Sequence, residues 1–570
     1  MDDLLTILLA AAAGVYLLAS GWLFVFGSNL TFLSVVATRG GRRRDEPGSP
    51  TADGETSTGG NDPASVTVLW PSVTVQLPIF NELYVAERVV RAAAELDYPA
   101  DRLHIQVLDD STDETSVLIG VVVDELRQRG VNIDHLHRSD REGYKAGALA
   151  AGLAVSDSEL VAVFDADFLP PADFLRRTVG HFATDERLAF VQTRWGHLNG
   201  EFSWLTRLQS LAIDGHFMVE QAARRHRGYW FNFNGTAGIW RRAAIDDAGG
   251  WTSDTLTEDL DLSYRAHLRG WHGHFRGDIE VPSELPAQMS SFRRQQHRWA
   301  RGSIECARKL LPAVWRADAS IGTRFQATMH LTAYGVHLLL FTLALLYPLI
   351  VLAGARYPGV STLFGVGYLF ALSSLTPAVF FLAGQRLLGR RWWRSIVPVL
   401  AVTVLGSGMM VNTVRAVFQI RTRPNPAFER TAKYGLATEP PVDDGPPAAL
   451  GSESDSSVGA ATANRWTHQR YQLDVDRIVI AEAALALYSI GSVMLAVANG
   501  NWGIAAYASV FATGLTMVVG LTLGQGIAVR RSSRARHRRM AAEAQRWSGR
   551  PAADDEAKEP SAATIAPRSA

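Results

Sequence analysis

The stretch from Leu160 to Phe168 reads LVAVFDADF, an apolar run followed by two acidic residues. An uncharged apolar run of this length is typical of a strand buried on both faces, which occurs in parallel sheets that carry helices on either side. The run ends at Asp165, so Asp165 and Asp167 are expected at the carboxyl edge of the sheet. Ligands of open α/β sheets bind at that edge.

The segments around this strand alternate between strand-like and helix-like patterns. Strands are expected at 72–77, 104–108, 131–137 and 188–192, and helices at 82–96, 115–129 and 259–268. This alternation predicts an α/β domain with a mostly parallel, Rossmann-like sheet over residues 71–310. No GxGxxG follows the first strand and no GxxxxGK[ST] occurs, which argues against dinucleotide and P-loop sites.

Charge and cysteine content exclude several classes of protein. The 570 residues carry 56 basic and 56 acidic side chains, so net charge gives no reason to expect a nucleic-acid partner. The single cysteine, Cys306, excludes an internal disulfide framework and a cysteine-rich metal site. The long apolar runs lie toward the two ends of the chain, which predicts a membrane protein with a charged central domain.

The apolar runs are long enough to cross a bilayer. An anchor is expected within 1–38, because the acidic start of the chain does not suit a cleaved signal peptide. Arginines after the anchor place the N-terminus outside and the next domain in the cytoplasm. Two pairs of spans are expected within 311–394 and 476–529, so we expect a multi-pass protein of the plasma membrane whose partners include the lipid bilayer.

One further apolar segment, 395–420, is ambiguous because polar side chains interrupt it at Asn412, Arg415 and Gln419. If it spanned the membrane, the arginine-rich tail 530–570 would lie outside. Counting arginines therefore favours an interfacial helix within 395–435 and five spans in total, with six spans as the alternative.

Three stretches have too few apolar side chains to offset the entropy of ordering the chain. We expect a disordered linker at 39–70, a polar loop at 436–475 and a disordered basic tail at 530–570.

Two acidic clusters are expected at the same edge of the sheet. Asp109 and Asp110 end one strand, as Asp165 and Asp167 follow another. Carboxylates two residues apart can reach a divalent cation whose other ligands are phosphate oxygens, although a lone Asp-x-Asp is more often a solvated loop. Together the clusters favour a nucleotide site. Lys145, flanked by glycines, is a candidate diphosphate contact, although a lone lysine is usually a solvated surface residue.

Two later segments complete the candidate site. Asp259, in Thr257-Glu258-Asp259, is a candidate general base for an acceptor hydroxyl, although acidic residues also suit the start of a helix. Gln295, Arg298 and Trp299 share one helical face. The indole offers a platform for a sugar and the guanidinium a partner for a leaving diphosphate. An amphipathic helix on the membrane surface is the alternative.

These motifs are specific enough to name a family. They are QLPIFNE (76–82), QVLDDST (106–112), GYKAGAL (143–149), FDADF (164–168), FNGTAGIW (233–240), AGGW (248–251), TEDLDL (257–262) and QQHRW (295–299). The segment resembles the processive, membrane-integrated glycosyltransferases of family 2, which are related to the cellulose synthases. It is most similar to the cellulose-synthase-like A and C branch, which includes glucomannan mannosyltransferases. Residues 428–433 resemble, more weakly, the gating loop of cellulose synthases, although Arg430 replaces a usually apolar residue.

The resemblance implies a GT-A fold and a role for each motif. The nucleotide sugar would contact Glu82, Asp109, Asp110, Lys145 and Asp165. Asp165 and Asp167 would bind Mg²⁺ or Mn²⁺, and Asp259 would be the catalytic base. The growing polysaccharide would contact Phe233, Asn234, Gly235, Thr236, Glu258, Gln295, Arg298 and Trp299. The gating loop would act through Phe428, Thr431 and Lys433.

Three functions are compatible with these motifs. The first is an inverting, processive hexosyltransferase that makes a cellulose-like β-glucan, a β-mannan or a glucomannan and moves it across the membrane. The second is a non-processive transferase that adds one sugar to a lipid carrier, and the third is a catalytically inactive receptor or scaffold. The QQHRW motif and the five spans favour the first over the second, and the complete acidic set argues against the third. UDP-glucose and GDP-mannose both fit as donors, and accessory subunits stay open.

Overall fold

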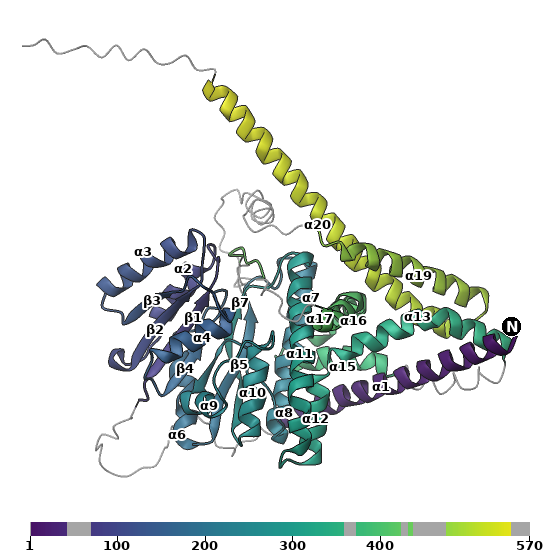
Figure 1. Cartoon of the computed structure of the whole chain (residues 1–570), viewed down its shortest axis with the longest axis horizontal. Helices are drawn as coiled ribbons and strands as arrows, with labels where there is room; N and C mark the ends of the chain where they lie inside the picture. Colours follow the sequence, from purple (N-terminus) through teal and green to yellow (C-terminus); the bar gives the residue numbers. More distant parts are fainter. Residues whose placement is uncertain (1, 43–69, 358–371, 423–430, 437–474, 549–570) are drawn as a thin grey trace, which may run out of the picture.

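The computed structural model describes residues 2–42, 70–357, 372–422, 431–436 and 475–548. It combines an α/β part with a group of long helices (Figure 1). Residues 43–69 of the expected linker, residues 437–474 of the expected polar loop and Phe428 lie outside the described residues, as does part of the expected pair of spans within 311–394. Residues 39–42 of the expected linker and residues 530–548 of the expected tail are helical, where the sequence predicts disorder.

A seven-stranded sheet forms the centre of the α/β part, in the order β3-β2-β1-β4-β6-β5-β7. The strands are β1 (Val73–Ile79), β2 (Leu103–Asp109), β3 (Ile133–His137), β4 (Leu160–Val163), β5 (Leu188–His197), β6 (Gly238–Arg241) and β7 (His272–Ser283). All neighbouring strands pair in parallel except β6, which is antiparallel to both β4 and β5. The expected, mostly parallel sheet is confirmed, and β6 and β7 extend it beyond the strands that the sequence predicts.

Helices cover both faces of the sheet. One face packs against α2 (Ala86–Ala94) and α3 (Thr115–Gln128) through buried side chains such as Val107 and Ile119. The other face packs against α4 (Tyr144–Ala154), α9 (Arg242–Asp247) and α10 (Glu258–Leu268) through Phe190 and Trp240. Three shorter helices are η1 (Ala100–Arg102), α5 (Phe174–Thr178) and α6 (Gly180–Thr184). The strand ends, and the acidic residues that follow them, therefore share one edge between two hydrophobic layers.

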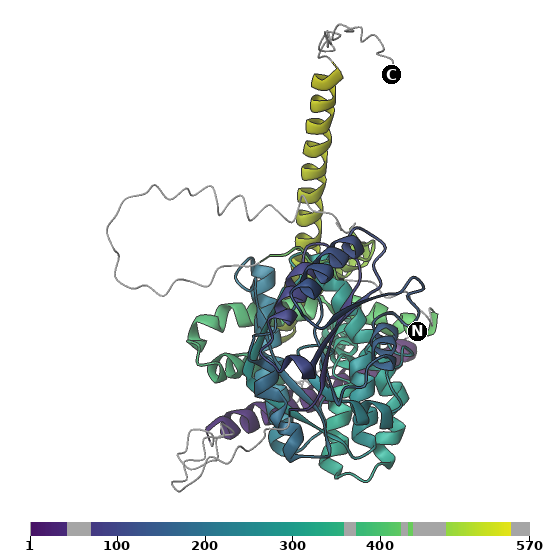
Figure 2. The same cartoon turned by 90° about the vertical axis from the view of Figure 1, so that its left-hand side faces the viewer.

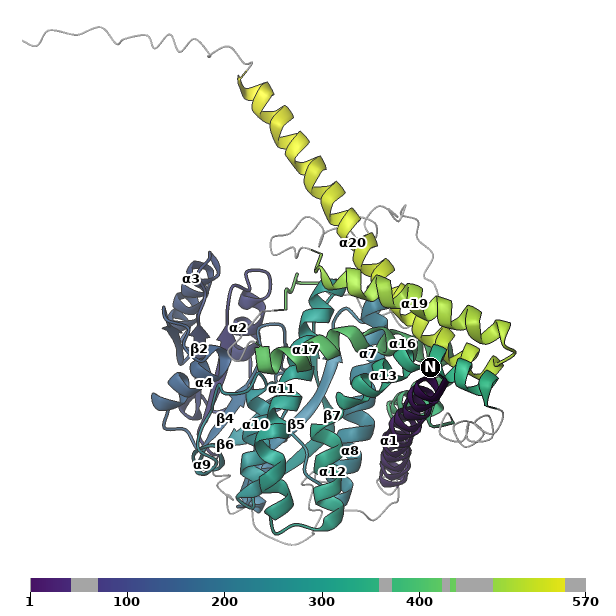
Figure 3. The same ribbon diagram turned by 45° about the vertical axis from the view of Figure 1, so that its right-hand side comes forward.

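A second set of helices joins the sheet to the apolar helices. One continuous helical segment contains α7 (Trp204–Gly215), the π-helix η2 (His216–Gln221) and α8 (Ala222–Arg227). It is followed after β7 by α11 (Met289–Arg316) and α12 (Ile321–Leu331). Figures 1 and 3 place α11 and α12 between the sheet and the apolar helices. This layer therefore connects the two parts of the molecule.

Five stretches of the described residues are long and apolar enough to cross a membrane: Leu4–Gly40, Gly335–Arg356, Trp392–Thr422, Ile478–Ala498 and Trp502–Arg531. The corresponding elements are α1 (Asp2–Arg42), α13 (Gly335–Arg356), η4 (Trp392–Ser395) with α16 (Ile396–Gly408) and α17 (Met410–Thr422), α19 (Ile478–Ala498) and α20 (Trp502–Ser548). Between them lie η3 (Leu372–Leu375) and α15 (Thr376–Leu387). Helix α20 projects beyond the rest of the protein (Figures 1 and 2).

The expected interfacial segment 395–420 is itself one of these apolar stretches, but it is divided at Met409 into α16 and α17. The polar residues that interrupt it all lie in α17. There the Asn412 side chain donates to the backbone oxygen of Arg293 in α11 at 3.1 Å, and Arg415 forms an ion pair with Asp476. Helix α17 therefore contacts α11 through polar groups, whereas α16 packs against α7 through apolar side chains such as Val399 and Val402.

Candidate functional site

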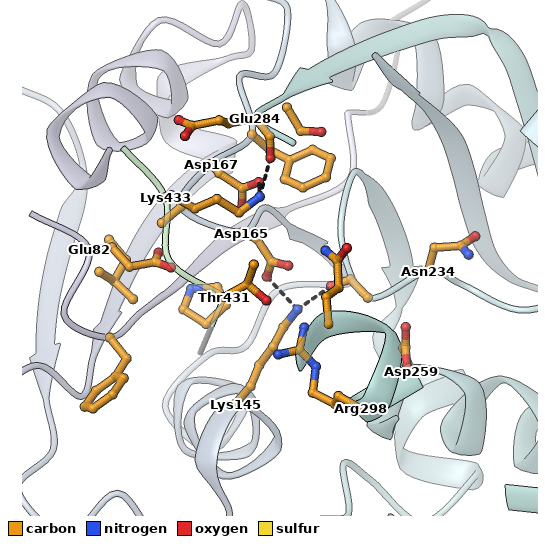
Figure 4. Close-up of a pocket in the computed structure, with 18 of the residues that line it drawn as sticks. Glu82, Lys145, Asp165, Asp167, Asn234, Asp259, Glu284, Arg298, Thr431 and Lys433 are labelled. Atoms are coloured by element: carbon orange, nitrogen blue, oxygen red, sulfur yellow. Dashed lines mark hydrogen bonds and ion pairs between the residues drawn. The ribbon is translucent and has the colours of Figure 1, made fainter. Parts of the chain in front are cut away.

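A cavity lies at the carboxyl edge of the sheet, where the sequence predicts the site (Figure 4). Strand ends supply one wall, α10 and α11 supply another, and the segment 431–436 supplies a third. The predicted site residues that line it are Glu82, Asp110, Lys145, Asp165, Asp167, Asn234, Gly235, Glu258, Asp259, Gln295, Arg298, Trp299, Thr431 and Lys433. Residues from widely separated motifs therefore meet in one place.

Each acidic residue of the Asp-x-Asp pair faces a lysine. The Lys145 ammonium lies 2.5 Å from an oxygen of Asp165 and donates to the backbone oxygen of Gly235 at 2.9 Å. The Lys433 ammonium lies 2.5 Å from an oxygen of Asp167. Burial opposes the charge of Lys145, but Asp165 and Glu258 outweigh it and raise the pKa of Lys145, so this side chain stays cationic.

Asp165 and Asp167 fit a divalent cation. Both carboxylates offer hard oxygen ligands to a cavity with room for further oxygen donors. Both are balanced by ammonium groups, which shows that this position favours positive charge. These two residues would hold Mg²⁺ or Mn²⁺, and such an ion would supply charge neutralisation for a diphosphate.

Asp259 lies in the first turn of α10, two residues after Thr257, which occupies the N-cap position. The Thr257 hydroxyl does not cap the helix and instead contacts the Cys306 thiol at 3.4 Å. Burial and the negative charge of Glu258 raise the pKa of Asp259 to about 7. A carboxylate with a pKa near neutrality is suited to accept a proton from a hydroxyl group.

Gly235 brings its backbone close to this carboxylate. Its φ of +81° is rarely adopted by other residues, and a Cβ there would lie 3.0 Å from Asp259 Oδ2 and 3.4 Å from Lys145 Nζ. Glycine is therefore needed at this position for both steric and conformational reasons.

Helix α11 carries Gln295, Arg298 and Trp299 into the cavity from the opposite wall, as their spacing predicts. The negative charges of Glu258 and Asp165 face Arg298, but burial dominates and lowers the pKa of its guanidinium. The Trp299 ring lies 6.4 Å from the ring of Trp195, measured between centroids. Trp195, on β5, also lines the cavity and was not predicted.

Three predicted contact residues do not line the cavity. The Asp109 carboxylate faces His135 Nε2 at 2.9 Å and His137 Nδ1 at 3.2 Å, and its neighbour Asp110 lines the cavity instead. Phe233 is fully buried in the core. Thr236 is buried, and its hydroxyl accepts the backbone N–H of Asp165 at 2.9 Å.

Asp109 forms a separate cluster with His135 and His137 outside the cavity. Although burial opposes it, hydrogen bonds from His135 and Ser111 hold the pKa of Asp109 below its usual range. Ligand atoms of Asp109, His135 and His137 lie within 4.8 Å of one another, so this trio is a second group of described residues that could hold a metal ion.

Glu284 is a site residue that the sequence did not indicate. Its carboxylate accepts the backbone N–H groups of Tyr434 at 2.7 Å and Leu436 at 3.0 Å. Lys433 donates to the backbone oxygen of Glu284 and to Asp167. Glu284 thus fixes the segment 431–436 over the cavity. Its only signal in the sequence is a single acidic residue between Ser283 and Leu285, which is too common to be informative.

Comparison with known proteins shows which family and which proteins this chain resembles. Residues 71–302 match the family described as "Glycosyltransferase like family 2". Glucomannan 4-beta-mannosyltransferase 1 of Oryza sativa subsp. japonica is 44% identical over 260 residues, which cover 45% of this chain and 50% of the relative. Glucomannan 4-beta-mannosyltransferase 2 of Arabidopsis thaliana is 47% identical over 251 residues, which cover 43% of this chain and 47% of the relative. The chain spans about half the length of the curated relatives it matches.

Among solved structures, the mannosyltransferase PcManGT from Pyrobaculum calidifontis, in complex with GDP-Man and Mn²⁺, has a TM-score of 0.43 and 20% identity. The match covers 66% of this chain and 98% of that one. The family match rests on the sequence comparisons. Residues 71–302 are therefore a glycosyltransferase family 2 domain, as the motifs predict, and this part of the chain is similar to glucomannan 4-beta-mannosyltransferases.

Proposed function

We propose that the protein is a membrane-embedded, inverting hexosyltransferase that extends a β-linked mannan or glucomannan from a nucleotide sugar. The observation that carries the proposal is the meeting of an Asp-x-Asp pair, a carboxyl group of raised pKa and a tryptophan side chain in one cavity. The similarity to glucomannan 4-beta-mannosyltransferases supports the choice of sugar.

The donor binds along the sheet edge. Glu82 and Asp110 hold the nucleoside end, and Arg138 orients Asp110 through two hydrogen bonds of 2.8 and 2.7 Å. Lys145 faces the diphosphate together with the cation site at Asp165 and Asp167. The sugar then extends toward α10 and α11.

The reaction is a single displacement. Asp259 accepts the proton of an acceptor hydroxyl, the hydroxyl oxygen forms a bond to the anomeric carbon, and the bond from that carbon to the diphosphate oxygen breaks. Lys145 and Arg298 stabilise the negative charge that develops on the leaving group. An α-linked donor sugar therefore yields a β-linkage.

The acceptor chain occupies the side of the cavity formed by Trp299 and Trp195. Aromatic faces provide a large apolar surface against which a pyranose ring can pack. Because α11 carries Trp299 and also contacts α17, a growing chain that leaves this site meets the apolar helices next. We therefore propose repeated addition, followed by export between these helices. The catalytic domain lies in the cytoplasm and the N-terminus outside.

The purified protein in lipid nanodiscs tests this function. With Mn²⁺ and a manno-oligosaccharide acceptor, we expect acceptor-dependent release of GDP from GDP-mannose, and slower release of UDP from UDP-glucose. The Asp259→Asn variant should release neither. Nucleoside diphosphate release that does not depend on the oligosaccharide but increases with added polyprenyl phosphate would contradict polymer synthesis. It would favour a lipid-linked product.

A further inference from the structure

One place in the described residues departs from α to π geometry: the turn His216–Gln221, between α7 and α8. Such π-turns are rare and often occur at functional sites. The turn lies behind the cavity wall, and none of its six residues lines the cavity. Two of its side chains nevertheless contact a residue that does.

That residue is Asn234. Its side-chain oxygen accepts a hydrogen bond from Gln221 Nε2 at 2.6 Å, and its side-chain nitrogen lies 2.9 Å from His216 Nε2. Its backbone N–H donates to Gln192 Oε1 at 2.7 Å. Both ends of the Asn234 amide are therefore held from outside the cavity.

These side chains form a series of hydrogen bonds in which the position of each proton determines the next. Gln221 donates to Asn234, so the amide oxygen must face Gln221 and the NH₂ group must face His216. His216 Nε2 is then an acceptor, and its proton is on Nδ1, which lies 3.0 Å from Glu220 Oε2. Burial alone would raise the pKa of Glu220, but Arg224 and His216 lower it, so Glu220 is an anion that accepts a hydrogen bond from this N–H group. Each group has one orientation that satisfies all of these bonds.

Asn234 keeps hydrogen-bonding capacity on its cavity side. An amide has two N–H donors and two acceptor positions, and the contacts of the described residues use one of each. Asn234 precedes Gly235, where an added Cβ would lie 3.0 Å from Asp259 Oδ2, and Figure 4 shows Asn234 and Asp259 on the same side of the cavity. A hydroxyl held by Asn234 would therefore lie next to the base.

We propose that His216 and Gln221 are positioning residues, which fix the amide of Asn234 so that it orients an acceptor hydroxyl beside Asp259. This role rests on the proposed function. The amide would otherwise present its oxygen and nitrogen in either order, and the acceptor would lose a donor of defined direction. The π-turn is what brings both side chains to the same amide.

Kinetics with a manno-oligosaccharide acceptor and GDP-mannose test the proposal. His216→Phe removes the acceptor atom and should reduce kcat/KM for the oligosaccharide about tenfold, the effect of one lost hydrogen bond, with KM for the donor unchanged. His216→Gln, whose amide oxygen can take the place of Nε2, should restore most of the loss. Met218→Leu, in the same π-turn, is the matched control and should behave as the unaltered protein.

A double-mutant cycle separates positioning from folding. If His216 acts through Asn234, His216→Phe should have no further effect once Asn234→Ala is present. A full effect in that background, or a His216→Gln variant as poor as His216→Phe, overturns the proposal and leaves the proposed function intact. Absence of transfer by the unaltered protein overturns both.

Discussion

At the scale of single residues, the adjacent carboxylates Glu258 and Asp259 show how the surroundings of an aspartate raise its affinity for a proton. Burial and like charge both disfavour ionisation, so Asp259 binds a proton more tightly than a free aspartate does. We expect Asp259→Asn to lower the transfer rate about 10²- to 10⁴-fold while nucleotide binding changes little. Isothermal titration with GDP and a transfer assay measure the two. Asp254→Asn, at an exposed position of the same segment, is the control. A full transfer rate in Asp259→Asn would show that Asp259 is not the general base.

The same carboxylate should determine how the transfer rate depends on pH. Because its pKa is raised to about 7, Asp259 is protonated and inactive at lower pH, and it becomes an effective base as the pH rises through neutrality. The rate should therefore increase about tenfold per pH unit between pH 5 and 6.5 and level off above 7.5. Initial rates at saturating donor show this directly. A rate that is independent of pH over this range would show that proton removal by Asp259 does not limit the reaction.

At this scale the sequence predicts which residue types lie near the site, but it does not predict which way each side chain points. Asp109 and Asp110 are chemically identical neighbours at a strand end, and successive residues of a strand point to opposite faces. Which of them enters the cavity depends on which face α3 covers, and that is settled only by packing. The same limit applies to Phe233 and Thr236, which belong to a recognisable motif but support it from inside the core.

At the scale of elements, the segment 431–436 lies over the proposed cation site. Lys433 neutralises Asp167, so a divalent cation must compete with its ammonium group. We expect Lys433→Met to bind Mn²⁺ about tenfold more tightly than the unaltered protein, as measured by the electron paramagnetic resonance signal of free Mn²⁺. Arg176→Met, which removes a cation from the exposed Asp97, should have no effect. Weaker Mn²⁺ binding in Lys433→Met would mean that the lysine assists the cation.

Elements with strong periodicity were predicted well, and those without it were missed. The run at 160–164 gave a strand, and the spacing at 115–129 gave a helix that ends one residue earlier than expected. Strand β6 has only four residues after a glycine-containing loop, and β7 is rich in histidine and charged residues. Both segments are strands because they pair with neighbouring strands of the sheet, and the local sequence carries no information about this pairing.

At the scale of the whole molecule, α11 links catalysis to the apolar helices. It carries Arg298 and Trp299 at the cavity and, one to two turns earlier, the buried Arg293. The Arg293 guanidinium contacts Glu482 of α19 at 2.8 Å and Thr522 of α20 at 2.9 Å. A single helix therefore fixes the distance between the site and two other helices.

Breaking this pair should destabilise the protein. Arg293→Met leaves the Glu482 carboxylate buried without its cation, which costs about 3–5 kcal/mol. We expect a lower Tm in nanodiscs by intrinsic fluorescence, and recovery of most of the loss in the double variant Arg293→Met with Glu482→Met. Arg308→Met, which replaces another arginine of α11, is a control. A single variant as stable as the unaltered protein would show that the pair does not join the two parts.

The central claim is tested most directly by the product made in membranes that contain the protein. Membranes are incubated with labelled GDP-mannose or UDP-glucose and Mn²⁺, and the label is partitioned between ethanol-insoluble material and organic solvent. The proposed function predicts ethanol-insoluble product that endo-β-mannanase degrades, and no such product with Asp259→Asn. Label that extracts wholly into organic solvent, or that accumulates equally with Asp259→Asn, would contradict it.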